Sequence, residues 1–245
     1  MNDSNVVKGY FFMSRSASEN MQAFSFSTKN RHFIKTEPID GINATSVFIT
    51  YSPERSEYLV TGLKAGLCIV PKNYSTNAAA AADNFTYYSG SPRYYLRRTK
   101  WVADLNLYFG ATGTDGNVYY SSDGITWNSK QVLSGNVLGI EYMSNQKKLV
   151  AISNNSQQIA ISSDGLNWTV KNAPFSAALA YAYDNEHDVL CVVDKTKSYA
   201  SSDLEKWTET VIPNNEQVNF RDIIYLGDGV FIANSFRKNK LYVLS

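Results

Sequence analysis

Tyrosine and arginine side chains are concentrated between residues 74 and 98 of the chain. This stretch contains Tyr87, Tyr88, Arg93, Tyr94, Tyr95, Arg97 and Arg98. Both residue types combine a large contact area with a polar end, and both are enriched where binding energy concentrates. Tyrosine faces can stack on sugar rings, and arginines can pair with the phosphate groups of an anionic cell-wall polymer. We therefore predict a contact surface here, with packing of these tyrosines in a strand as the alternative.

The residues needed for the common catalytic mechanisms are missing or scattered. His32 and His187 are the only histidines and lie far apart, which argues against a histidine-rich metal site. No Gly-x-Ser-x-Gly phrase and no glycine-rich phosphate loop occurs. The acidic turns at Asp115-Gly116 and Asp184-Asn185-Glu186 could bind calcium, but such turns are more often simply solvated. The sequence thus predicts no enzyme, no catalytic residue, no metal and no cofactor.

A seven-residue phrase recurs in the second half of the chain. It predicts the strands and turns that would position the candidate binding residues. It reads Ser-Ser-Asp-Gly-Ile-Thr-Trp at 121–127, Ser-Ser-Asp-Gly-Leu-Asn-Trp at 162–168 and Ser-Ser-Asp-Leu-Glu-Lys-Trp at 201–207. The tryptophans are 41 and 39 residues apart, and such a period is typical of repeat architectures. Asp-Gly between apolar runs predicts a hairpin turn, because glycine accepts the positive φ that the turn requires.

We expect the phrase to have a structural role, with turn-forming and packing residues in each copy. These residues are Ser121, Asp123, Gly124, Trp127, Ser162, Asp164, Gly165, Trp168, Ser201, Asp203 and Trp207. Each aspartate should accept backbone N–H groups, and each indole should pack against the neighbouring repeat. The third copy has Leu204 in place of glycine, so we expect its turn to be built differently.

The phrase resembles the Asp-box, or BNR repeat, whose usual form is Ser-x-Asp-x-Gly-x-Thr-Trp. The resemblance implies a β-propeller with the motif on the hairpin between the two outer strands of each blade. It implies no single activity, because such propellers include sialidases, glycan binders, assembly factors and phage tail proteins. The sialidases carry an arginine in a Phe/Tyr-Arg-Ile-Pro phrase near their start. None of the eight arginines here lies in such a phrase, so sialidase activity is not expected.

Short apolar runs separated by polar turns continue between the motif copies, as in Ile140–Tyr142, Ala180–Tyr183 and Ile223–Tyr225. Runs of this length and spacing predict an all-β fold. We expect residues 1–245 to form a single β-propeller of about six four-stranded blades, with five as the alternative. The ring would close by pairing of the terminal strands, which removes exposed edges. An atypical insertion at about 74–98 interrupts the second unit.

Composition narrows the functional hypotheses. The net charge of +1 gives no electrostatic signature for nucleic acid or an acidic membrane. The first residues lack the pattern of a secretory signal, and no apolar run is long enough to cross a bilayer. Tyr, Asn and Ser are abundant, as in viral structural proteins and carbohydrate-contacting surfaces.

We therefore expect a non-enzymatic bacteriophage tail or receptor-binding protein, located in the virion and made in the host cytoplasm. Its partners would be other virion proteins and a host cell-wall glycan or polymer, with self-association into a homo-oligomer as a further option. The alternative is a cytoplasmic glycan-binding or scaffold propeller of a cell. Glycoside hydrolysis is a weaker alternative, because the carboxylates of a propeller site can converge from distant blades.

Overall fold

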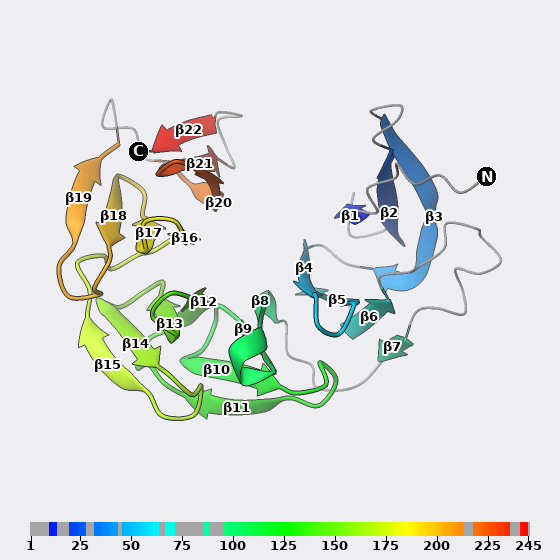
Figure 1. Cartoon of the computed structure of the whole chain (residues 1–245), viewed down its shortest axis with the longest axis horizontal. Coiled ribbons are helices and arrows are strands. Elements are labelled where there is room, and N and C mark those ends of the chain that lie inside the picture. Colours follow the sequence, from blue (N-terminus) through cyan, green and yellow to red (C-terminus); the bar gives the residue numbers. More distant parts are fainter. Residues whose placement is uncertain are drawn as a thin grey trace.

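The computed structural model describes residues 10–13, 20–27, 32–43, 46–63, 67–71, 86–88, 96–212, 218–235 and 241–244. These residues form antiparallel sheets arranged around a common centre, as Figure 1 shows. The first strand of each sheet lies nearest the centre and the last lies at the rim. This arrangement confirms the prediction of an all-β propeller.

Four of the sheets are complete four-stranded blades. One blade consists of β4 (Ser46–Ser52), β5 (Glu57–Leu63), β6 (Leu67–Pro71) and β7 (Thr86–Tyr88). The next consists of β8 (Arg97–Val102), β9 (Leu107–Ala111), β10 (Asn117–Ser121) and β11 (Asn128–Gln131). It is followed by β12 (Val137–Met143), β13 (Lys148–Ser153), β14 (Gln158–Ser162) and β15 (Thr169–Asn172). The fourth consists of β16 (Ala180–Asp184), β17 (Val189–Val193), β18 (Lys197–Ser201) and β19 (Thr208–Val211).

Two further sheets lie at the ends of the open ring, and each has three strands. The first contains β1 (Tyr10–Met13), β2 (Asn20–Ser27) and β3 (His32–Asn43). The last contains β20 (Phe220–Gly227), β21 (Val230–Ser235) and β22 (Leu241–Leu244). The one helix among the described residues is a single 3₁₀ turn, η1 (Ala103–Leu105), and none of them forms a helix that could span a membrane.

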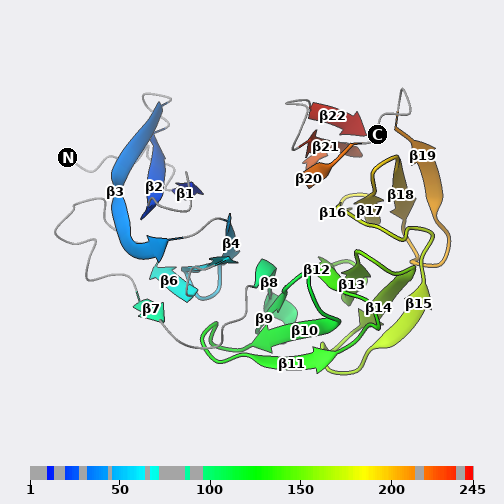
Figure 2. The same cartoon turned by 180° about the vertical axis from the view of Figure 1, so that it is seen from behind.

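The predicted number of four-stranded blades is therefore wrong: the described residues form four, not six or five. The six units counted from the turns correspond to six sheets, but the first and the last sheet each have three described strands instead of four. The predicted closure is not seen either, since no described strand of the first sheet pairs with the last sheet. The ring is open between them in both views (Figures 1 and 2).

The repeated Ser-Ser-Asp phrase forms the hairpin between the two outer strands of three blades, as predicted. In the first copy the Ser121 hydroxyl accepts the N–H of Gly124 at 2.8 Å. The Asp123 carboxylate accepts the N–H groups of Ile125 and Thr126 at 2.8 and 2.7 Å. The second copy repeats this network around Ser162 and Asp164. Gly124 and Gly165 take φ values of 73° and 74°, as the hairpin prediction requires.

The expectation of a different third turn is wrong. Ser201 accepts the N–H of Leu204 at 2.9 Å, and Asp203 accepts the next two N–H groups at 2.8 Å each. Leu204 adopts φ 64°, the conformation that glycine takes in the other copies. The serine and aspartate side chains hold the turn firmly enough to keep a leucine in this costly region.

The motif tryptophans pack between blades, although not equally. Trp127 is buried, whereas Trp168 and Trp207 are half-buried. The indole N–H groups of Trp127 and Trp168 each donate to the turn glycine carbonyl at 3.0 Å. The three blades from β8 to β19 each present apolar residues to both neighbours. In β13, for example, Leu149 and Ala151 face the preceding blade while Val150 and Ile152 face the following one.

The outer strands β11 and β19 are exposed along their whole length, and β15 is exposed at every residue except the half-buried Lys171. Lysines on two of them reach the turn of the next blade. Lys130 on β11 donates to the Leu166 carbonyl, and Lys171 on β15 pairs with Glu205. The rim is thus a series of solvated strands whose charged side chains connect adjacent hairpins.

We predict that the Asp164 turn makes stability dependent on acid pH. The N–H and side-chain amide of Asn167 and the N–H of Leu166 hold the pKa of Asp164 well below its usual value. Because the folded pKa is depressed, this stabilisation is present above the unfolded pKa, about 3.9, and is lost as pH falls through the folded pKa. Urea denaturation at pH 7 should show Asp164→Asn to be less stable than the wild type, and the difference should shrink at pH 3.

Ser163→Ala, in the same turn but exposed, is the matched control and should follow the wild type at both pH values. An Asp164→Asn deficit of equal size at both pH values would contradict the prediction.

Candidate functional site in the axial channel

The innermost strand β8 carries a β-bulge at Arg98. Arg97 pairs with Ala111 and Lys100 with Phe109, so β8 advances three residues where β9 advances two. Arg98 takes a φ of 50° within this bulge. A positive φ at a non-glycine residue is costly, and such strain and bulges are frequent beside functional sites. The bulge therefore indicates that a functional site lies at the centre of the ring.

The Arg98 side chain crosses the centre of the ring to the opposite blades. Its guanidinium donates to the carbonyls of Leu179 at 3.1 Å and Arg221 at 2.9 Å. It also lies 5.2 Å from the centroid of the Tyr181 ring, within cation–π range. Arg98 thus connects β8 with residues at the starts of β16 and β20.

A cavity of about 400 Å³ opens beside Arg98 at the starts of the inner strands. We call it the arginine cavity. It is lined by Phe48, Arg97, Arg98, Gly113, Leu138, Asn154, Leu179, Phe220, Arg221 and Asp222. Three arginines and one aspartate are among these residues, which gives the lining a positive balance of charge. No described residue accepts a hydrogen bond from the Arg97 guanidinium.

A second cavity, of about 310 Å³, lies on the other side of Arg98, further along the same strands. We call it the lysine cavity. Its lining residues are Ile49, Thr50, Tyr51, Arg98, Thr99, Lys100, Trp101, Ile140, Glu141 and Tyr181. The two cavities are lined by residues on or next to the inner strands and share Arg98, and we refer to them together as the axial channel.

Lys100 and the buried Glu141 form an ion pair in the lysine cavity. The Lys100 side chain lines this cavity and is 36% exposed. Burial within the ring lowers the pKa of Lys100 to about 8. A lysine with such a pKa exchanges protons near neutral pH, which gives the cavity acid–base capacity.

Tyr181 forms the wall behind Arg98. Its hydroxyl donates to the Ile140 carbonyl at 3.2 Å, and burial raises its pKa to about 12. Gly139 makes this position possible, since a Cβ there would lie 2.1 Å from the tyrosine oxygen. The tyrosine therefore acts as a neutral aromatic surface against which Arg98 is held.

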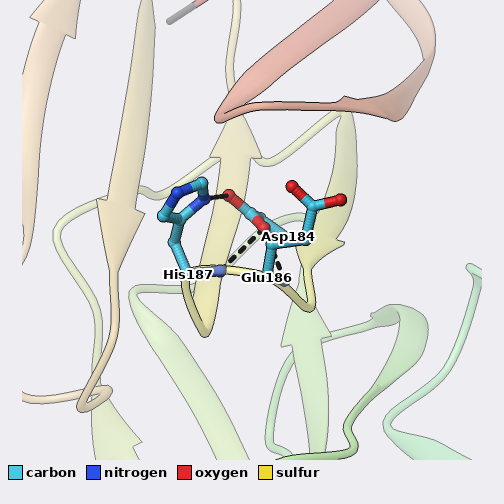
Figure 3. Close-up of side chains that lie close together, drawn as sticks. All are labelled: Asp184, Glu186 and His187. Carbon is cyan, nitrogen blue, oxygen red and sulfur yellow. Dashed lines mark hydrogen bonds and ion pairs between the residues drawn. The ribbon is translucent and has the colours of Figure 1, made fainter.

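A separate polar cluster lies on the turn between β16 and β17 (Figure 3). Ligand-type atoms of Asp184, Glu186 and His187 come within 4.8 Å of one another. The Asp184 carboxylate faces the His187 ring, and the Glu186 carboxylate is turned away. Asp184 accepts the N–H groups of Glu186 and His187 at 2.8 and 3.0 Å and contacts His187 Nδ1 at 2.8 Å.

Glu186 connects this turn to the last sheet. It accepts the Tyr225 hydroxyl at 2.7 Å and the N–H of Asp228 at 3.1 Å. Burial alone would raise the pKa of Asp184, but its hydrogen bonds from His187 and Glu186 outweigh burial and lower it. Both carboxylates are thus engaged in protein contacts, and we assign the cluster a structural role between two sheets rather than a ligand-binding one.

The sequence-predicted binding residues fall at different radii. Tyr87 and Tyr88 lie on the outer strand β7, where they pair with Cys68 and Leu67. Arg97 and Arg98 begin the innermost strand of the next blade and line the arginine cavity. Arg93, Tyr94 and Tyr95 lie outside the described residues. The structure therefore does not bring the Tyr87–Tyr88 pair together with the Arg97–Arg98 pair, and binding by the full set stays a prediction.

Sequence reasoning did not select Lys100, Glu141, Tyr181 or Arg221. No local motif marks them, because they meet only when the inner strands gather around the axis. One signal was available: Lys100, Glu141 and Tyr181 are 41 and 40 residues apart, close to the repeat period. Aligning polar residues on the inner strands by this period would have placed them around one channel.

Neither a protein-family model nor a curated protein sequence matches the chain. Solved structures do resemble it in fold. Virginiamycin B lyase from Staphylococcus aureus has a TM-score of 0.70 at 13% identity, covering 99% of this chain and 85% of the lyase chain. A chain of a nidogen/laminin complex has a TM-score of 0.67 at 9% identity, covering 96% and 88%. A streptogramin B lyase has a TM-score of 0.66 at 10% identity, covering 98% and 84%.

These similarities support the propeller fold and correct one inference from the sequence. The chain was expected not to be an enzyme because common catalytic motifs are missing. The virginiamycin B lyase likeness overturns that expectation, since the same fold supports an enzyme. Missing local motifs are a poor guide here, because the side chains of a propeller channel come from separate blades.

Proposed function

We propose that the chain binds an anionic ligand, bearing phosphate or carboxylate groups, in its axial channel. The observation that carries this proposal is the convergence of Arg97, Arg98 and Arg221 on one cavity. Guanidinium groups pair with phosphate and carboxylate in a planar, often bidentate geometry. Arg98 is already held by two carbonyls, so Arg97 is the group that a ligand would meet first.

The remaining lining of the arginine cavity suits a ligand with a carbon skeleton. Phe48 and Phe220 supply aromatic surface, whereas Asn154 supplies amide hydrogen-bonding groups. An acidic sugar or a phosphate-bearing polyol unit would place its anionic group against Arg97 and its ring or chain against the phenylalanines. A polymer of such units could enter through one end of the channel.

We further propose that this binding serves attachment of a virion to an anionic polymer of the host cell wall. The tyrosine-, asparagine- and serine-rich composition and the arginine-lined cavity support this role. A cellular glycan-binding propeller would use the same cavity. The identity of the polymer that binds distinguishes this role from attachment of a virion.

The binding proposal predicts charge-specific loss of affinity. Arg97→Gln and Arg221→Gln should each weaken binding of fluorescent polyphosphate or polygalacturonate by about tenfold, as expected for one charge-assisted hydrogen bond. Lys206→Gln, on an exposed turn, removes the same charge far from the cavity and should bind like the wild type. Dextran is the neutral control polymer. Equal losses in all three variants, or equal binding of dextran, would overturn the proposal.

A second candidate function, catalysis, is favoured by the Lys100–Glu141 pair. A lysine with a pKa of about 8 beside a carboxylate can remove and return a proton near neutral pH. Incubation with polygalacturonate, followed by measurement of new reducing ends and of ultraviolet absorbance from double bonds, tests this role. Product formation that disappears in Lys100→Met would support catalysis, and intact polymer after prolonged incubation with the wild type would exclude it for this substrate.

A further inference from the structure

Lys100 has a single protein partner in the lysine cavity. An ammonium group has three N–H donors, and the one hydrogen bond that Lys100 Nζ donates among the described residues goes to Glu141 Oε1. The lysine side chain is half-buried and lines the cavity. A ligand in this cavity would therefore meet a lysine nitrogen that the protein engages on one side.

Glu141 is fixed beside this nitrogen by the backbone of its own strand. Lys100 lies on β8 and Glu141 on β12, the innermost strands of neighbouring blades (Figure 1). The buried Glu141 accepts the N–H of Tyr142 at 2.8 Å through Oε1, the same oxygen that contacts Lys100. No described residue donates a hydrogen bond to the other oxygen, Oε2. The pair thus places a nitrogen next to a carboxylate that can take up and return a proton.

A second cation lines the same cavity. Both hydrogen bonds that Arg98 donates to carbonyls come from Nη2, and a guanidinium has three further N–H groups. Arg98 and Lys100 against Glu141 give the lining two cations and one carboxylate, which favours a ligand with an anionic group. Ile49 and Ile140 add apolar surface, and the volume of about 310 Å³ suits a small molecule.

We propose that the lysine cavity binds a small oxo acid, a molecule with an aldehyde or ketone carbonyl and a carboxylate, and that Lys100 forms an imine with its carbonyl carbon. The ligand carboxylate pairs with the planar guanidinium of Arg98, and its carbonyl carbon faces Lys100. This site is separate from the polymer-binding proposal, which concerns the arginine cavity. It also differs from proton removal by the Lys100–Glu141 pair, because here the nitrogen itself forms a bond.

The reaction balances with the groups that line the cavity. Lys100 first passes one proton to Glu141, which frees the lone pair of Nζ. The nitrogen attacks the carbonyl carbon, so the C–N bond forms and the carbonyl electron pair moves to oxygen. Two of the three ammonium protons reach this oxygen through Glu141, the C–O bond breaks and water leaves. The product is an iminium paired with the Glu141 carboxylate, and no oxidant or reductant is consumed.

Reductive trapping of the native protein with glyoxylate and cyanoborohydride tests the proposal. Reduction of the imine leaves a carboxymethyl group on the modified lysine, which mass spectrometry of peptides locates. Lys100 should be labelled at least about tenfold faster than the exposed Lys206, because burial lowers the pKa of Lys100 to about 8 and favours the neutral amine. Equal labelling of the two lysines in the folded wild type would overturn the proposal without any variant.

Two variants test the roles of the neighbouring side chains, with Lys206 as the internal reference in each. Glu141→Gln keeps the size of the side chain but cannot carry the proton, so labelling of Lys100 should fall at least about tenfold. Arg98→Gln should slow labelling by glyoxylate but not by acetaldehyde, which has no carboxylate. An equal effect of Arg98→Gln on both aldehydes would overturn the assignment of an oxo acid, and unchanged labelling in Glu141→Gln would overturn the proton transfer.

Polyphosphate binding distinguishes this inference from the proposed function. Labelling of Lys100 in a protein that does not bind polyphosphate would support the imine site and reject the arginine-cavity proposal. Binding of polyphosphate with Lys100 and Lys206 labelled alike would do the reverse.

Discussion

Gly165→Ala should lower the free energy of unfolding by about 2–5 kcal/mol, although it adds a single methyl group. Gly165 takes a φ of 74°, which costs alanine about 1–2 kcal/mol. A Cβ at this position would lie 2.5 Å from the Phe109 ring of the preceding blade. Phe109 is fully buried and cannot move aside without disturbing the core between two blades. Urea denaturation of the variant measures the loss.

The equivalent residue of the third motif distinguishes backbone strain from the clash with Phe109. Leu204 occupies the same turn position with φ 64° and is buried among core residues of its own interface. The turn itself therefore tolerates a side chain. We attribute most of the stability lost in Gly165→Ala to the clash with Phe109. A double variant, Gly165→Ala with Phe109→Leu, should be more stable than the sum of the single losses predicts. Strict additivity would show that backbone strain alone is responsible.

Arg98→Gln should combine a loss of ligand affinity with a loss of stability. It removes the charge shared by both axial cavities, and we expect binding of polyphosphate to weaken by about 10–100-fold. It also leaves the carbonyls of Leu179 and Arg221 without their charged donor, at a cost of about 1–3 kcal/mol. Fluorescence anisotropy and urea denaturation measure the two effects separately.

Arg98→Lys is the matched variant because it retains the charge. An ammonium group lacks the planar fork and stacks less well on Tyr181, so it should recover part of the affinity and little of the stability. Arg98→Gly relieves the positive φ and tests the strain. If Arg98→Gln bound polyphosphate like the wild type, Arg98 would be only a structural link between blades.

Local turn chemistry explains why much of the fold was predictable. Serine, aspartate and glycine within one seven-residue phrase form hydrogen bonds to their own turn, so the sequence determines the hairpins directly. The inner strands were also predictable, because Ile140–Tyr142, Ala180–Tyr183 and Ile223–Tyr225 form β12, β16 and β20 with polar turns after them. Blade completion and ring closure depend on contacts between the chain ends, which no local pattern records.

The axial site was less predictable because its geometry is not local. Arg98 enters the channel through a bulge that arises from pairing of β8 with β9, and its partners lie 81 and 123 residues away. Its selection from the sequence relied on the neighbouring tyrosines, of which Tyr87 and Tyr88 lie on the outer strand. Composition therefore selected two arginines that line the arginine cavity without identifying the cavity, and their role in binding stays a prediction.

The exposed outer strands have a consequence for behaviour at high protein concentration. Unpaired edge strands can recruit strands from other molecules and start aggregation, and charged residues on an edge oppose this. β11 and β15 carry Lys130 and Lys171, whose side chains are tied to the next hairpin, and β19 carries Glu209, which pairs with Lys197. Addition of a foreign strand would have to displace these contacts and place like charges together. We therefore expect that the rim resists edge-to-edge polymerisation, so that concentrated solutions of the protein stay free of fibres.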